Sequence, residues 1–144
     1  MTKRKKSFCF FLCLLIGLFG FSTTTEAAVS GITPYYDYTM FTSSGLNITS
    51  SGRADVSIVC SGMSNCTKIS AETCLQRKVG IIWVKVNIGV SGNIWTSSTT
   101  SQDLAKTYSA MLSKSGTYRA KTIFTVYSGS KSEKITLYSG TDTY

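Results

Sequence analysis

Apolar and polar residues alternate along several short segments of the chain, which is the period of a strand with one buried face. The alternation is clearest over residues 118–127, whose apolar side is made of Tyr118, Ala120, Thr122, Phe124 and Val126. The same period predicts strands over residues 54–60, 68–75, 81–88 and 133–139. In the segment 81–88, we expect Ile82, Val84, Val86 and Ile88 to share one face and Trp83 to lie on the other.

Weaker patterns lie between these strands. Residues 46–49 predict a short strand, and residues 104–112 fit a strand better than a short helix because apolar residues recur there at period two. Turns are predicted at residues 78–80 and 128–130, where glycines interrupt the alternation. Residues 91–103 are rich in Ser and Thr and are expected to form a polar loop that carries Trp95.

About seven short strands in one domain of this length predict an all-β fold, namely an immunoglobulin-like antiparallel β-sandwich. Tyr118 follows the glycine turn at Gly116, where such folds place the tyrosine corner, although an ordinary strand aromatic would fit the same position. Ala120 occupies the place of the second cysteine of antibody domains, so their inter-sheet bridge is not expected.

The start of the chain has the order of a secretory signal peptide. Four of the first six residues are cationic, residues 8–21 are an uncharged apolar run, and small residues follow at Ala27 and Ala28. We expect cleavage after Ala27, with Ala28 as the alternative, because the run is shorter than the ~20 residues of a spanning helix. The predicted organisation is a signal peptide at 1–27, an aromatic-rich arm or edge strand at 28–45 and the sandwich domain at 46–144.

The predicted mature chain, residues 28–144, has eleven Lys or Arg and six Asp or Glu, a net charge of +5. Its cations are spread along the sequence without a dense block, so no nucleic-acid partner is expected. A mildly positive surface fits an anionic cell envelope, although it also fits an ordinary solvated surface.

Three cysteines remain after the signal peptide, and an odd number leaves at least one thiol unpaired within the chain. Cys60 and Cys66 flank a short loop and are the candidate disulfide. Cys74 is the candidate free thiol, on the outward side of its strand. Three thiols without histidine are a poor zinc set, so no metal site is predicted.

A resemblance to a known family rests on the stretch Ser115-Gly116-Thr117-Tyr118-Arg119-Ala120-Lys121, continued by residues 124–133, with Cys60-Ser61-Gly62, Leu75-Gln76-Arg77-Lys78 and Trp83 upstream. The last two thirds of the chain resemble small exported β-sandwich proteins of Gram-positive, clostridia-type bacteria. The resemblance implies a fold and an exported location, and it supplies no catalytic residues. Cys66 and Cys74 depart from the family pattern, so it implies no disulfide state for this chain.

The composition argues against most enzyme classes. The chain has no histidine, which removes the usual triad base and zinc ligand. Six acids remain, but no pair has the spacing that would single it out for glycoside cleavage, and no phosphate-binding loop is present. We therefore expect no enzyme activity, no catalytic residues and no cofactor.

Aromatic residues are the best functional signal in the sequence, and Tyr36, Trp83 and Trp95 are the candidate ligand contacts. The alternative is that Trp83 closes the edge of the core and Trp95 pins its loop.

We expect a secreted, non-enzymatic binding or structural module that is loosely held at the cell surface. Its partner would be a cell-envelope polymer, a glycan or a protein, with membrane contact only through the signal peptide during export. A diffusible effector, such as a toxin or a bacteriocin-like protein, is the alternative from another class. The sequence does not indicate an oligomeric state.

Overall fold

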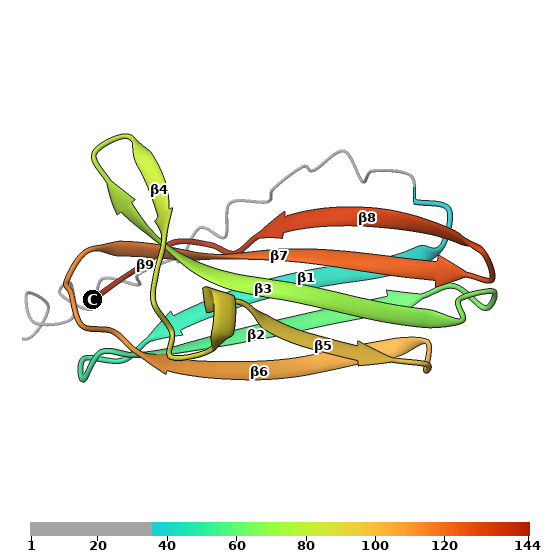
Figure 1. Ribbon diagram of the computed structural model, residues 1–144, viewed down its shortest axis with the longest axis horizontal. Coiled ribbons are helices and arrows are strands. Elements are labelled where there is room, and N and C mark those ends of the chain that lie inside the picture. Colours follow the sequence, from blue (N-terminus) through green and yellow to red (C-terminus); the bar gives the residue numbers. More distant parts are fainter. Residues whose placement is uncertain (1–35) are drawn as a thin grey trace, which may run out of the picture. The chain divides into compact units, whose positions relative to one another are not determined.

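The computed structural model describes residues 36–144, and these residues form an all-β unit of antiparallel strands (Figure 1). The strands are β1 (Thr39–Ile48), β2 (Arg53–Gly62), β3 (Lys68–Val79), β4 (Ile82–Lys85), β5 (Trp95–Thr99), β6 (Asp103–Met111), β7 (Thr117–Ser128), β8 (Lys131–Tyr138) and β9 (Asp142–Thr143). A single 3-10 turn, η1 (Ser91–Asn93), precedes β5.

The strands form two sheets. The first has three strands in the order β1-β2-β6. The second has six strands, with β3 and β7 at its centre. On one side of β3, β5 pairs with its first half and β4 with its second half. Beyond β7 lie β8 and the short β9.

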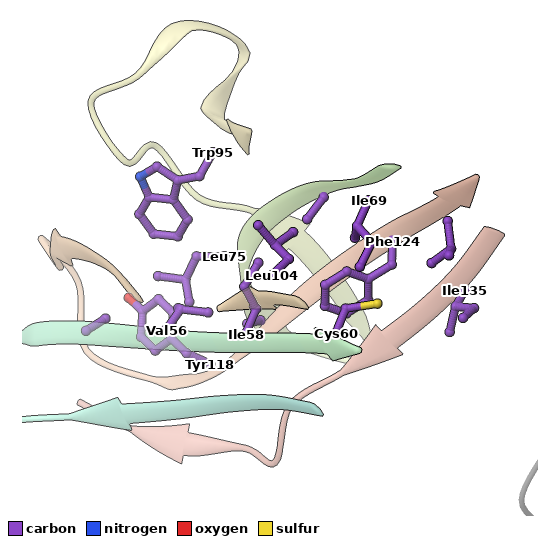
Figure 2. Close-up of a cluster of buried hydrophobic side chains, with 14 of the residues drawn as sticks. Val56, Ile58, Cys60, Ile69, Leu75, Trp95, Leu104, Tyr118, Phe124 and Ile135 are labelled. Carbon is purple, nitrogen blue, oxygen red and sulfur yellow. The ribbon is translucent and has the colours of Figure 1, made fainter. Parts of the chain in front are cut away.

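The core lies between the two sheets and is built from the inward side of each alternating strand (Figure 2). Strand β2 contributes Val56 and Ile58, β3 contributes Leu75, and β7 contributes Tyr118 and Phe124, all at most 1% exposed. Thr73 and Thr122 are also fully buried, as register partners on β3 and β7, and their hydroxyls are 3.1 Å apart.

The strands predicted at 54–60, 68–75, 104–112 and 118–127 are confirmed, since β2, β3, β6 and β7 cover these segments.

Three predicted elements differ in the structure. The predicted arm or edge strand ended at residue 45; an edge strand, β1, is present, but it runs through that boundary from Thr39 to Ile48 because its whole length pairs with β2. Residues 95–99 of the predicted polar loop form β5, which pairs with β3. The strand predicted at 81–88 ends at Lys85, and only its last part, Val86 and Ile88, packs against the core.

Tyr118 lies at the entry to β7, directly after the turn that contains Gly116. Its ring is 1% exposed, and its hydroxyl donates a hydrogen bond to the backbone carbonyl of Lys114. Burial raises the pKa of Tyr118, so the hydroxyl keeps the proton that it donates. The side chain thus ties the loop before β7 to the core.

The predicted signal peptide, residues 1–27, lies outside the described residues, as does the first part of the predicted arm. Among residues 36–144, no helix has the length and apolar character needed to cross a membrane.

Candidate functional site

The outer face of the six-stranded sheet carries most of the cations of the described chain. Residues that are paired directly across neighbouring strands point to the same side, so the register places six cations on the side away from the core. We call this surface the basic face; its cations are Lys68 and Lys78 on β3, Lys85 on β4, Arg119 and Lys121 on β7, and Lys134 on β8. Glu72 is the one acid among the strand residues of this face.

The outer face of the three-stranded sheet is different. The charged strand residues there are Arg53, Asp55 and Asp103, so the positive and negative charges nearly cancel. Arg53 forms an ion pair with Asp55 at 2.9 Å, and Ser109 also donates to Asp55 and lowers the pKa of that carboxyl. The positive charge is therefore concentrated on one side of the unit.

Arg119 of the basic face is held between two aromatic rings. Its guanidinium carbon lies 4.2 Å from the ring centroid of Trp83 and 4.1 Å from that of Tyr138. Its Nε donates to the side-chain oxygen of Gln76 at 2.9 Å. A cation within about 6 Å of a ring face is attracted by the ring quadrupole, so β4, β3 and β8 together fix this side chain.

A shallow hollow of about 500 Å³ lies on the same face, across β3, β5 and β7. Its lining includes the hydroxyl-bearing residues Ser70, Thr96, Ser98 and Thr125, together with the charged residues Lys68 and Glu72. Hydroxyl groups both donate and accept hydrogen bonds, so the hollow offers partners to the hydroxyls or oxyanions of a polymer.

The three candidate aromatics have different positions. Trp83 is half-buried on β4, against Arg119 of the basic face. Tyr36 is half-buried and packs against the core. Trp95 is only 9% exposed and stacks on Tyr108 with ring centroids 5.1 Å apart, so it belongs to the core edge and is not an exposed ligand contact (Figure 2).

The structure does not contain the predicted bridge between Cys60 and Cys66. Both are free cysteines, as is Cys74. Cys60 faces the core, and burial raises the pKa of its thiol to about 12. The Cys66 thiol instead lies 3.7 Å from the carbonyl oxygen of Lys68, to which it donates.

Cys74 lies on the outward side of β3, as predicted, yet it is only 8% exposed. Burial raises the pKa of its thiol, against the opposing effect of the neighbouring cations Lys85, Lys121 and Arg119. The thiol is therefore neither exposed nor activated.

Two carboxylates, those of Glu133 and Asp142, hold the two ends of β1 in place. Glu133 accepts hydrogen bonds from the amides of Asp37 and Tyr38 and from the hydroxyl of Thr39, at 2.6–3.0 Å, and so fixes the start of β1. Asp142 accepts from the amide of Ile48 at 2.6 Å and fixes its other end. Within residues 36–144, no three Cys, Asp or Glu side chains gather in a metal-binding arrangement.

Sequence reasoning treated the cations as dispersed and so missed the basic face. A local signal was present, because Arg119 and Lys121 share the outward side of β7 with Tyr127. The cations of β3, β4 and β8 join them only through strand pairing, which no local pattern contains.

A scan against models of protein families, a search of curated proteins and a search of solved structures each found no match.

Proposed function

We propose that this protein is an exported, non-enzymatic binding module that holds an anionic polymer of the cell envelope on its basic face. The observation that carries the proposal is the concentration of six cations against one acid on one side of the unit, while the opposite side is nearly neutral. The signal-like start of the chain supports the exported location.

The spacing of the cations favours a polymer over a compact ligand. Neighbouring strands are about 4.8 Å apart, and residues two apart on one strand are about 7 Å apart. Arg119 and Lys121 therefore repeat along β7, while Lys85 and Lys134 extend the positive surface across the sheet. A chain with a charge on each repeat unit can contact several of these groups at once, and its hydroxyls can bond to those that line the hollow.

The strand order also supports an immunoglobulin-like sandwich as the scaffold. If β6, β7 and β8 are the E, F and G strands of that fold, then β1-β2-β6 is A-B-E and β3-β7-β8 is C-F-G. The hydrogen bond from Tyr118 to Lys114 is the bond that a tyrosine corner would make.

Charge-reversal variants test the proposal on residues 28–144. Lys121→Glu/Lys134→Glu changes the basic face, and Lys106→Glu/Lys114→Glu makes the same change in net charge at exposed positions away from it. Binding to immobilised heparin at physiological salt should weaken about tenfold or more in the first variant, since each cation contributes on the order of 1 kcal/mol at an anionic surface. The control variant should lose much less, and neutral dextran should not bind.

Equal losses in the two variants would mean that net charge alone drives binding, which contradicts a site on this face. Fractionation of the producing culture tests the location: the proposal expects the protein on the cells and its release by salt, because surface charge attraction is screened by salt. Protein that is entirely free in the medium would instead favour a diffusible effector.

A further inference from the structure

The end of β3, the turn and β4 form a hairpin, residues 77–85, that projects beyond the rest of the six-stranded sheet (Figure 1). Its side chains are unusually exposed for their type. Ile81, at the turn, is 95% exposed, Ile82 is 59% exposed, and Val79 and Val84 are each more than 40% exposed. Contiguous exposed apolar side chains on a small unit mark a contact surface.

The pairing register gives the hairpin two different faces. Val79 pairs with Ile82 and Arg77 with Val84, so Val79, Ile82 and Val84 share one side, which no second layer covers. Lys78 pairs with Trp83, and both lie on the other side. Gly80, with φ of 60°, begins the tight turn that places Ile81 at the tip.

The charged residues of the hairpin and of the segments next to it in sequence have one sign. No Asp or Glu occurs between Glu72 and Asp103, while Lys78 and Lys85 flank the apolar tip. A protein partner or a second copy would offer acids only at particular points, whereas the surface of an anionic bilayer is negative everywhere around an inserted tip. Trp83 lies directly behind the tip, at the level where tryptophan is favoured at membrane interfaces.

The dimensions also fit a bilayer surface. From the turn to Lys85 the hairpin extends about 10 Å at 3.3 Å per residue, which is close to the ~5–10 Å depth of interfacial segments. Long lysine stems let the flanking ammonium groups remain among the head groups while the apolar tip enters.

We propose that this hairpin inserts its tip, Val79 to Ile82, into the surface of an anionic lipid bilayer, with Trp83 at the interface and Lys78 and Lys85 at the head groups. This contact goes beyond the expectation that the chain meets a membrane only during export. It shares Lys78 and Lys85 with the basic face, but the apolar side chains of the tip, on which insertion depends, take no part in the proposed polymer binding.

Vesicles of phosphatidylcholine with roughly a third phosphatidylglycerol, an anionic composition, provide the test on residues 28–144. We expect cosedimentation and a blue shift of tryptophan emission that is lost in Trp83→Phe, since Trp95 is already buried. Ile81→Ser/Ile82→Ser should lower partitioning by at least about tenfold, given the apolar area removed. The control Met40→Ser/Met111→Ser removes two other exposed apolar side chains and should partition like the wild type.

Three results would overturn the proposal: no binding to these vesicles, equal binding by the two double variants, or binding without a change in Trp83 emission. A concentration-dependent dimer that Ile81→Ser/Ile82→Ser abolishes, with no vesicle binding, would assign the tip to a second copy instead. Heparin binding distinguishes the two proposals, because Ile81→Ser/Ile82→Ser should retain it even where vesicle binding is lost.

Discussion

Arg119 between its two rings offers a stability prediction that can be worked out from the structure. Arg119→Met keeps most of the aliphatic stem and removes the guanidinium. Each half-exposed cation–π contact contributes about 0.5–1 kcal/mol, and the bond from Nε to Gln76 contributes roughly 1 kcal/mol. Because such contributions do not add fully, we expect the free energy of unfolding to fall by about 1–2 kcal/mol.

A double-mutant cycle isolates the contact with Trp83. Arg119→Met, Trp83→Leu and the double variant are compared by urea denaturation followed by circular dichroism, which does not depend on the tryptophan signal. The coupling energy should be about 0.5–1 kcal/mol. Arg119→Lys keeps the charge but loses the planar stack, so it should lie between the wild type and Arg119→Met. A coupling energy of zero with an unchanged midpoint for Arg119→Met would refute the stacked arrangement.

Three further predictions concern the core. Tyr118→Phe removes the donor to the Lys114 carbonyl and should lower the free energy of unfolding in urea by about 1–3 kcal/mol; an unchanged value would mean that the bond is not made in solution. Thr73→Val or Thr122→Val alone leaves one buried hydroxyl unpaired and should cost about 1–3 kcal/mol, while the double variant should be nearly neutral; additive losses would contradict the pairing. The pKa of Cys60 is raised from 9.0 to about 12 in the folded state. The stability that the neutral buried thiol contributes is therefore intact below pH 9 and is lost as the pH rises toward 12, because the unfolded chain releases the proton first. The free energy of unfolding should therefore fall less steeply in that range for Cys60→Ala, and equal slopes would contradict the buried thiol.

The alternating strands were predictable because each has one covered and one open face, and that difference is recorded in the residues themselves. β7 is the clearest case, with five buried side chains at period two from Tyr118 to Val126. β5 was not predictable in the same way. It has Trp95 and then only Ser and Thr, and it is a strand because β3 pairs with it.

Periodicity identifies which side chains share a face, but it does not reveal whether another layer covers that face. Ile82 and Val84 have the pattern of core residues and are exposed, because no strand of the other sheet reaches the hairpin. Cys74 has the pattern of a surface residue and is buried among long neighbouring side chains. The site was missed for a related reason: the cations that form it are far apart in sequence and are brought together only by the register of the sheet.

Binding of an anionic polymer to the outer face of the six-stranded sheet can be located residue by residue in an NMR titration. Uniformly ¹⁵N-labelled residues 28–144 would be titrated with a heparin oligosaccharide at physiological salt. We expect the largest amide shifts on β3, β7 and β8, around Arg119, Lys121 and Lys134, and little change on β1, β2 and β6. Shifts concentrated on the three-stranded sheet, or no saturable shifts at all, would contradict it.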